Sequence, residues 1–401
     1  MHCIRSVTED ILFLGASDRR LALFENVFPI PRGISYNAYL VLDEKTVLLD
    51  TADWAVGERF MENLSCGLGG RALDYVVVSH MEPDHAATLT QVLRTYPEAQ
   101  VVGNAKTAAM IGQFFDCDIS QRMVMVKEGD TLQTGRHTFT FLMAPMVHWP
   151  EVMVTYDAAD KVLFSADAFG TFGALNGSIF ADEVNFERDW LDDARRYYAN
   201  IVGKYGAQVQ TLLKKAAGVD IAYICPLHGP IWRENGAWFV EKYQRWSTYT
   251  PEERTAAIFC GSVYGHTENA ADILATRLAE RGVRDIRLYD VSHTDVSLLV
   301  SEVFRCSHLV LACATYNGGI FTPMENFLLD LKAHNLQNRT VAVVDNGTWA
   351  AAAGKQMREL VGTMKNMTVL EGGVSLKSSV KEAQRTELEA LADTLASDIL
   401  G

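Results

Sequence analysis

The sequence predicts two successive domains: a sheet-rich sandwich in residues 1–250 and a doubly wound parallel sheet in residues 251–401. Two observations predict this division. A chain of 401 residues with 48% hydrophobic composition exceeds what one core usually serves. The rhythm of the chain also changes after the polar tract 246–253, from short apolar segments with turns to repeats of strand, glycine-bearing loop and helix.

The first 250 residues alternate short apolar segments with polar or glycine-containing turns, which is the pattern of β-strands. Strands are expected at 39–42, 46–49, 75–78, 101–102, 139–143, 162–164 and 221–224. A series of this kind indicates a sheet-rich sandwich.

Residues 251–401 contain fewer but more regularly spaced apolar strands, expected at 256–259, 309–312 and 341–344. The first of them runs through a loop with glycines and hydroxyl groups into a helix expected at 269–281. Strand, loop and helix in this order predict a doubly wound α/β sheet.

The composition excludes several classes of partner. The formal net charge is −14, and the chain shows no cluster of Lys and Arg of the kind that neutralises phosphates, so nucleic acid is not an expected partner. No stretch approaches the roughly 18 consecutive apolar residues of a membrane span, and the amino terminus lacks the pattern of a signal peptide. The chain is therefore expected in the cytoplasm, without a membrane partner.

The densest group of chemically active side chains directly follows the expected strand 75–78. Four potential metal ligands fall within residues 80–85, and three more each follow another expected strand. A group so rich in His, Asp and Glu would be costly to bury without a cation, so these residues predict a metal centre at one sheet edge. The predicted ligands are His80, Glu82, Asp84, His85, His148, Asp167 and His228.

These residues resemble the flavodiiron branch of the metallo-β-lactamase superfamily, and the resemblance extends from residues 33–39 into the C-terminal half. It implies a metallo-β-lactamase-like αββα sandwich followed by a flavodoxin-like doubly wound parallel sheet. Hydrolases of the superfamily carry His at the position of Glu82, and a carboxylate there makes an oxygen-richer, more anionic shell that suits two irons. The resemblance assigns His80, Glu82 and His148 to one iron, Asp84, His85 and His228 to the other, and Asp167 to a bridge between them.

Residues around this centre have two interpretations each. Asp50 ends the expected strand 46–49 and is either an acceptor that orients a ligand imidazole or an ordinary turn residue. Trp149 and Tyr198 either line a small-gas pocket, as the resemblance implies, or belong to the core. The remaining histidines match no motif and are expected to be structural; they are His2, His137, His293, His308 and His334.

Three loops of the second domain are expected to meet at a ligand crevice, because they follow consecutive strands of an open parallel sheet. The first loop offers backbone N–H groups, a helix N-terminus and hydroxyls to a phosphate dianion, although an ordinary strand–helix turn looks similar. The GxGxxG fingerprint of NAD sites is absent after the first strand. The second domain resembles flavodoxin, which implies FMN with its phosphate in the first loop and its isoalloxazine ring between the other two. The expected contacts are Ser262, Val263, Tyr264, Gly265, His266, Thr267, Thr315, Tyr316, Asn317, Gly318, Gly319, Asn346, Gly347, Thr348, Trp349 and Ala350.

Two departures from the flavodoxin pattern bear on the flavin potential more than on FMN binding. His266 stands where Asn is commoner, and the loop at 346–350 has fewer glycines than many relatives. Tyr316 and Trp349 are the candidates for packing against the flavin ring.

The resemblance implies an oxidoreductase that passes electrons through FMN to a non-haem diiron site, where dioxygen is reduced to water or nitric oxide to nitrous oxide. One alternative is a metal-dependent thioester or phosphoester hydrolase with a regulatory flavodoxin domain; Glu82 counts against it. Another is a metal-free electron carrier or redox-responsive module, which leaves the predicted ligands without a purpose. Because both gases are small and neutral, the sequence leaves the preference between them open.

The electron donor is expected to be a separate molecule. The seven cysteines are scattered and never spaced as CxxC, which indicates neither a disulfide framework nor a rubredoxin module. A rubredoxin-like carrier, a flavin reductase and a reduced deazaflavin are all compatible donors.

The chain is expected to form a head-to-tail homodimer, because a short tether between the domains limits how the two crevices of one chain can face each other. A dimer of dimers is a further possibility.

Overall fold

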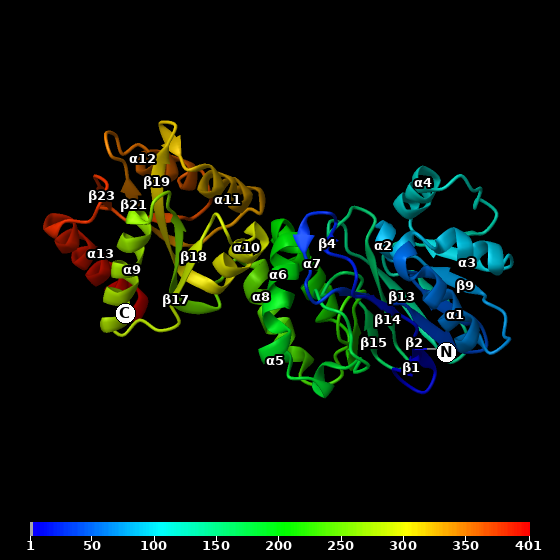
Figure 1. Ribbon diagram of the computed structural model, residues 1–401. Coiled ribbons are helices and arrows are strands. Elements are labelled where there is room, and N and C mark those ends of the chain that lie inside the picture. Colours follow the sequence, from blue (N-terminus) through cyan, green and yellow to red (C-terminus); the bar gives the residue numbers. More distant parts are fainter. Residues whose placement is uncertain (1–2) are drawn as a thin grey trace. The chain divides into compact units, whose positions relative to one another are not determined.

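The computed structural model describes residues 3–401, which form two compact units (Figure 1). The first unit contains the chain up to Tyr198 together with Tyr205–Gln244, and the second contains Ala199–Lys204 and Arg245–Gly401. The chain enters the second unit at Arg245, close to the position between residues 250 and 251 where the sequence pattern changes. His2 lies outside the described residues.

The short segment Ala199–Lys204 belongs to the second unit, which no hydrophobic pattern indicated. Hydrogen bonds explain its membership. The hydroxyl of Tyr249 donates to the carbonyl of Gly203 (2.8 Å), and the amide of Asn200 donates to the carbonyl of Ser297 (3.1 Å). Side chain to backbone contacts of this kind leave no periodic trace in a sequence.

Two mixed sheets form the centre of the first unit. The first sheet has the strand order β1 (Arg5–Ser6), β2 (Ile11–Phe13), β7 (Tyr39–Leu42), β8 (Thr46–Leu49), β9 (Tyr75–Val77), β10 (Gln100–Gly103) and β11 (Met123–Met125). The second has the order β12 (Thr131–Gln133), β13 (Thr138–Met143), β14 (Met153–Asp157), β15 (Val162–Phe164) and β16 (Tyr223–Cys225). Two small ribbons accompany them, β3 (Ala16–Asp18) with β6 (Ile34–Tyr36) and β4 (Leu23–Phe24) with β5 (Phe28–Pro29).

Helices cover the outer sides of the two sheets, which gives the expected αββα layering (Figure 1). On the side of the first sheet lie α1 (Gly57–Leu68), α2 (Pro83–Ala86), α3 (Leu89–Thr95) and α4 (Ala105–Phe114). On the side of the second sheet lie α5 (Phe186–Asp189), α6 (Leu191–Tyr197), α7 (Gly206–Ala216) and α8 (Gly236–Ser247). Short turns of 3₁₀ or π helix occupy Trp54–Val56, Ala181–Glu183, Tyr198–Val202 and Gly203–Tyr205.

Strand direction brings the ligand-bearing loops to one edge of each sheet. In the first sheet β8, β9 and β10 pair in parallel. In the second sheet β15 and β16 are parallel, and β13 shares their direction because it and β15 are both antiparallel to β14. The carboxyl ends of β13, β15 and β16 therefore lie at the same edge.

The expected strands of the first unit are all present, with small shifts. The strand expected at 221–224 is Tyr223–Cys225, and the one expected at 101–102 extends to Gln100–Gly103. The sequence analysis missed β14, which is buried along its whole length. A strand with both faces covered shows no alternation of polar and apolar residues, so its pattern does not stand out.

The second unit is a doubly wound sheet, as expected. Its order is β18 (Arg287–Asp290), β17 (Glu253–Gly261), β19 (Cys306–Tyr316), β21 (Thr340–Asn346) and β22 (Thr368–Val369), all in parallel pairs. β23 (Val374–Leu376) pairs in parallel with the carboxyl-terminal part of β21, and β20 (Gly319–Ile320) turns back against β19.

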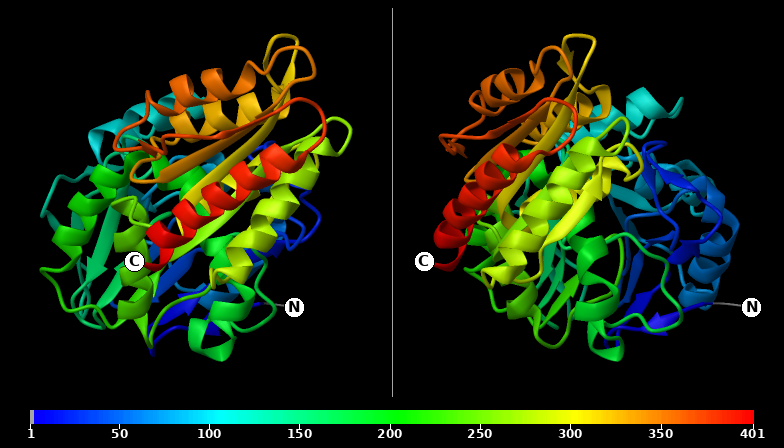
Figure 2. Two further views of the ribbon diagram at one scale, coloured as in Figure 1. Left: turned by 90° about the vertical axis from the view of Figure 1, so that its left-hand side faces the viewer. Right: turned by 60° about the vertical axis from the view of Figure 1, so that its left-hand side comes forward.

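Helices lie on both faces of this sheet. On one face α9 (His266–Glu280) and α13 (Glu382–Leu400) lie side by side in both views of Figure 2. Their buried residues, among them Leu274 and Leu395, share one core with the strands beneath. The other helices are α10 (Val296–Arg305), α11 (Thr322–Ala333) and α12 (Ala353–Val361). Within residues 3–401, no helix is both long and apolar enough to cross a membrane.

Candidate metal centre and flavin site

The loop after β9 carries the first ligand group. Pro83 begins the single turn of α2, and Glu82 precedes it as the N-cap residue. One helical turn therefore holds Asp84 and His85 directly beside Glu82. Asp50, at the end of β8, accepts hydrogen bonds from the backbone N–H groups of Ser79 (2.7 Å) and His80 (3.3 Å) and so fixes the entry to this loop.

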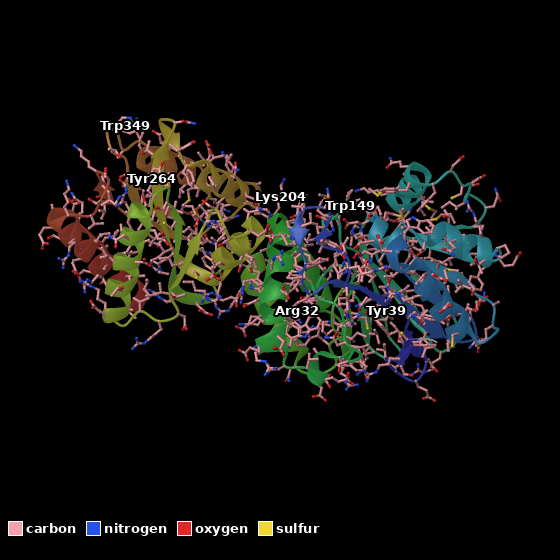
Figure 3. The ribbon with its side chains drawn as sticks, in the orientation of Figure 1. Arg32, Tyr39, Trp149, Lys204, Tyr264 and Trp349 are labelled. Carbon is pink, nitrogen blue, oxygen red and sulfur yellow. The ribbon has the colours of Figure 1, made fainter. Side chains whose placement is uncertain are left out.

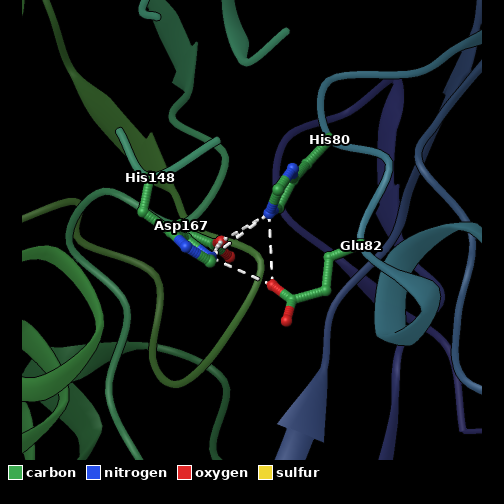
Figure 4. Close-up of side chains that lie close together, drawn as sticks. All are labelled: His80, Glu82, His148 and Asp167. Carbon is green, nitrogen blue, oxygen red and sulfur yellow. Dashed lines mark hydrogen bonds and ion pairs between the residues drawn. The ribbon is translucent and has the colours of Figure 1, made fainter. Parts of the chain in front are cut away.

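Four side chains from three loops form the first donor set (Figure 4). His80 Nε2 lies 3.2 Å from Glu82 Oε2 and 3.3 Å from His148 Nε2. His148 Nε2 lies 3.0 Å from Glu82 Oε2. Asp167 Oδ2 closes the set, at 3.2 Å from His80 Nε2 and 3.1 Å from His148 Nε2.

The second donor set lies directly beside the first and consists of Asp84, His85 and His228. The Nε2 atoms of His85 and His228 are 3.0 Å apart, and each lies 3.2 Å from Asp84 Oδ2. Asp167 Oδ1 lies 3.3 Å from His85 Nε2 and 3.7 Å from His228 Nε2. The two oxygens of Asp167 thus face different donor sets, as a bridging carboxylate would.

These distances fit metal coordination. Donor atoms that share one cation at about 2.1 Å lie about 3.0–3.4 Å apart in tetrahedral or octahedral geometry. Both carboxylate oxygens of Asp84 and of Asp167 are buried, and none has a well-aligned hydrogen-bond donor among the described residues. Buried carboxylate oxygens of this kind require a cation.

The pKa values show how these groups share protons. Despite burial, the imidazoles of His148 and His80 hold the pKa of Glu82 well below its usual value. Burial, together with repulsion from Glu82 and Asp167, raises the pKa of Asp84 to about 8. Burial alone would lower the pKa of His148, but Asp167 and Glu82 outweigh it and raise this pKa to about 9. A bound cation would take over the role of these protons, so metal binding is expected to release them.

Two ligand imidazoles have their second nitrogen fixed by an acceptor. His80 Nδ1 lies 2.8 Å from Glu151 Oε1, which also accepts from the N–H of Met81 (2.8 Å). His228 Nδ1 lies 2.7 Å from the carbonyl oxygen of Ser35. Such acceptors fix the tautomer and orientation of a ligand imidazole.

Asp50 was one candidate for this orienting role. Its carboxylate accepts the two backbone hydrogen bonds described above. This supports the other interpretation, in which Asp50 is an ordinary turn residue. The carboxylate bound to a ligand imidazole is that of Glu151, which lies in the same loop as His148.

Aromatic rings surround the ligand imidazoles. Trp149 packs edge-on against His80, with ring centroids 5.2 Å apart, and stacks with Phe114. Tyr198 is buried against Tyr243, whereas its neighbour Tyr197 packs 5.4 Å from His228. The gas-pocket role of Trp149 and Tyr198 stays a prediction.

The four described histidines that were expected to be structural are hydrogen-bonded elsewhere. His137 binds Asp157, His293 binds Asp290, His308 binds Asp398, and His334 lies near the carbonyl of Asn200. His137, Asp157 and Asp160 are close enough together to resemble a further metal site. Because Arg136 pairs with Asp160, this cluster already contains a compensating cation.

In the second unit, the first predicted flavin loop joins β17 to α9. Gly265 precedes α9 with a φ of +86°, a conformation that favours glycine, and its N–H donates to the hydroxyl of Ser262 (3.1 Å). The Thr267 side chain is buried, and its hydroxyl accepts from the amide of Asn346 (3.2 Å). The first loop is thereby tied to the third.

The second and third loops are also joined. The hydroxyl of Thr315 accepts from the N–H groups of Ala352 (2.9 Å) and Ala353 (3.2 Å). Two aromatic side chains of the flavin loops, labelled in Figure 3, are almost fully exposed: Tyr264 (89%) and Trp349 (93%). Tyr316 is half-exposed at 48%. A planar aromatic ligand would cover such surfaces.

Comparison with known proteins agrees with this two-part architecture. Residues 34–229 match the model of the ODP family beta lactamase, and residues 258–390 match that of flavodoxin. The anaerobic nitric oxide reductase flavorubredoxin of Klebsiella pneumoniae is 28% identical over 390 residues, which span 96% of this chain and 78% of that protein.

Solved structures with the same order of domains match almost the whole chain. Rubredoxin oxygen:oxidoreductase from Desulfovibrio gigas is 29% identical with a TM-score of 0.88, over 99% of this chain and 98% of that one. The flavodiiron protein from Giardia intestinalis shares the fold with a TM-score of 0.92 at 23% identity, over 99% and 97% of the two chains. The chain belongs to the flavodiiron family.

In this flavodiiron chain, some residues at the two sites were missed by sequence reasoning. Glu151 shares the loop of His148, and Tyr197 ends α6 beside Tyr198, but neither belongs to a motif. Glu25, in the β4–β5 turn, approaches the centre from a distant part of the sequence; partial desolvation of this exposed side chain and the nearby Glu82 carboxylate raise its pKa. Ser378 contacts the third flavin loop through Thr348 (3.1 Å). Of these residues, only Glu151 could have been found from the sequence, because a carboxylate close to a predicted ligand is a common hydrogen-bond acceptor for a ligand imidazole.

Proposed function

We propose that this flavodiiron oxidoreductase passes electrons from an external donor through FMN to a diiron centre that reduces dioxygen to water or nitric oxide to nitrous oxide. Its cofactors are FMN in the second unit and two irons in the first. His80, Glu82 and His148 would hold one iron, Asp84, His85 and His228 the other, and Asp167 would bridge them.

The arrangement of Asp167 carries this proposal. Its two oxygens lie 3.1–3.3 Å from nitrogens of different donor sets, so one side chain connects two adjacent cation sites. The centre also contains three carboxylates, because Glu82 occupies the position that is His in the hydrolases of the superfamily. Four imidazoles with three carboxylates favour iron over zinc.

The bound groups supply the electron chemistry: FMN exchanges electrons one or two at a time, and the irons bind and reduce the gas. The protein positions the donors and excludes water. Glu151 and the Ser35 carbonyl orient two imidazoles, and Trp149 and Tyr197 place apolar ring surface against the same two. Apolar rings beside the ligands favour a small neutral gas over charged substrates.

Steady-state turnover with each gas tests the proposal. Protein produced with iron available is expected to hold about two irons and one FMN per chain. With a chemically reduced donor under anaerobic conditions, added dioxygen or nitric oxide should oxidise the donor catalytically. The faster gas identifies the preferred substrate, and a comparison of rubredoxin, flavin reductase and reduced deazaflavin identifies the donor class.

Failure has a distinct signature. Stoichiometric zinc after iron-replete expression, with ester hydrolysis and no gas reduction, would replace the proposal with the hydrolase alternative. Absence of bound flavin would contradict the assignment of the second unit.

We further propose that the working form is a head-to-tail homodimer, in which the flavin of one chain faces the diiron centre of its partner. Each unit offers apolar surface near its own site. Val27, in the same β4–β5 turn as Glu25, is 57% exposed, and Trp349 of the third flavin loop is 93% exposed. Exposed apolar side chains around a site are typical of an interaction surface.

A further inference from the structure

A fourth loop reaches the flavin edge of the second unit. β23 pairs in parallel with β21, with Asn346 opposite Leu376, so the residues that follow Leu376 leave the sheet at the same edge as the three predicted loops. This segment, Lys377-Ser378-Ser379-Val380-Lys381, leads into α13 and is called the 377–381 loop below.

Asn346 fastens the 377–381 loop to the phosphate-binding loop. Its side-chain amide donates to the carbonyl of Ser378 (2.8 Å) and to the hydroxyl of Thr267 (3.2 Å), and its side-chain oxygen accepts from the N–H of Ser378 (3.0 Å). The Ser378 hydroxyl donates to Thr348 (3.1 Å). Ser378 has a φ of +71°, an unfavourable conformation for a side chain other than glycine, and these hydrogen bonds hold it there.

This network separates Thr267 from Ser378 by a single side chain. Because Thr267 lies in the first turn of α9, where the FMN phosphate would bind, the 377–381 loop is a neighbour of that phosphate. The isoalloxazine ring, by contrast, would lie toward the exposed aromatic residues of the other two loops, Tyr316 and Trp349.

The 377–381 loop differs in charge from the three predicted flavin loops. The three predicted flavin loops, residues 261–269, 315–319 and 346–350, contain no Lys or Arg and one acidic residue, Glu268. The 377–381 loop contains two lysines, Lys377 and Lys381, and no acidic residue. Both are exposed, and no ion pair of either is found in the described structure. In a chain of net charge −14, the three predicted loops therefore offer no Lys or Arg to a phosphate dianion.

We propose that the 377–381 loop forms a fourth wall of the FMN site, in which Lys377 and Lys381 provide positive charge to the phosphate and Asn346 holds the loop in place. This inference rests on FMN being the flavin of the second unit. The lysines act through charge and not through contact with the ring, so they should discriminate FMN from riboflavin, which lacks the phosphate.

Flavin titration of the full-length chain tests this proposal. Bound flavin is removed, and the binding of FMN and of riboflavin is followed by fluorescence quenching at low and high salt. The variant Lys377→Gln with Lys381→Gln should bind FMN roughly fivefold more weakly at low salt. Its riboflavin affinity should match that of the parent, and high salt should narrow the difference in FMN affinity.

A matched control removes the same charge elsewhere. Lys332 lies in the last turn of α11, and Lys365 follows the C-terminal end of α12; both are exposed and away from the flavin loops. Lys332→Gln with Lys365→Gln should therefore leave FMN affinity unchanged. Unaltered FMN binding in the Lys377, Lys381 variant would overturn the proposal, as would an equal loss of FMN and riboflavin. After either result the chain would still bind flavin. Failure of the flavin assignment in the proposed function would instead leave a chain without bound flavin.

Discussion

The most consequential single residue is Asp167, because both donor sets depend on it. Asp167→Ala should lose both metals, since it removes the shared ligand and the negative charge that reduces repulsion between two cations. Metal analysis after iron-replete expression measures the loss. Asp84→Ala, which removes a carboxylate from the second set alone, is the matched control and should retain more iron. If Asp167→Ala keeps both irons and full gas reduction, Asp167 is not a bridge.

In the proposed centre, Glu82 would decide between oxygen-rich and nitrogen-rich coordination. Glu82→His should shift the first donor set toward zinc, because it removes an anionic oxygen beside His80 and His148 and adds an imidazole. Competition between iron and zinc during reconstitution measures the shift, with the parent chain as reference. An unchanged iron-to-zinc ratio would contradict the argument that Glu82 selects the metal.

Glu151 is a positioning residue, since it reaches the centre through His80. Glu151→Ala should weaken metal binding by roughly 10- to 100-fold, because the His80 ring loses the acceptor that fixes its tautomer. Glu151→Gln keeps an acceptor oxygen for His80 and for the N–H of Met81, so it should restore much of the affinity. Metal titration of the three proteins provides the comparison. Equal affinities in all three would show that this hydrogen bond does not orient the ligand.

At the scale of elements, one carboxylate joins the two sheets of the first unit. Asp43 lies in the turn between β7 and β8 and accepts hydrogen bonds from the turn between β12 and β13. The donors are the backbone N–H groups of His137 (2.8 Å) and Arg136 (3.0 Å) and the hydroxyl of Thr134 (2.8 Å). Partial burial opposes ionisation, but these donors prevail and lower the pKa of Asp43 to about 2.

This shift predicts how stability depends on pH. A carboxylate with a lowered pKa stabilises the fold above its ordinary pKa of 3.8, and that stabilisation is lost as the pH falls through about 2. Asp43→Asn should therefore reduce the free energy of unfolding by about 1 kcal/mol near pH 7, a value limited by solvent screening. Denaturant unfolding of metal-free parent and variant chains from pH 7 to pH 3 checks this. A difference that does not narrow at the acidic end would assign the effect to packing instead.

At the scale of the whole molecule, the proposed head-to-tail dimer would make electron transfer a property of two chains. One chain is disabled in flavin binding by Ser262→Glu with Trp349→Ala, and the other in metal binding by His80→Ala with His85→Ala. Thr267 is left intact because its side chain is buried. Each homodimer should be inactive, whereas the purified heterodimer should recover roughly half the parent activity if the two sites act independently.

Cofactor analysis provides the control for this experiment. The heterodimer must contain flavin in one chain and iron in the other before activity is compared. A heterodimer with both cofactors that stays as inactive as the homodimers would place electron transfer within one chain, and the head-to-tail arrangement would be rejected.

The cofactor types followed from the resemblance to the flavodiiron family. The sequence by itself determined the two-part fold and predicted the set of candidate metal ligands. It did so because strand ends can be read from apolar periodicity, and residues after parallel strands meet at one edge whatever the details of packing. The loop at 80–85 was especially informative, since its ligands are neighbours in the chain.

Only the tertiary structure decided which residues support the metal ligands and the flavin loops. Glu151, Tyr197 and Ser378 act across distances in the chain or outside strand ends, through hydrogen bonds and ring contacts that have no period. The same holds for the role of Asp50 and for the inclusion of Ala199–Lys204 in the second unit. Periodicity records which face of an element is buried, whereas the partner of a single polar group depends on how separate loops pack together in space.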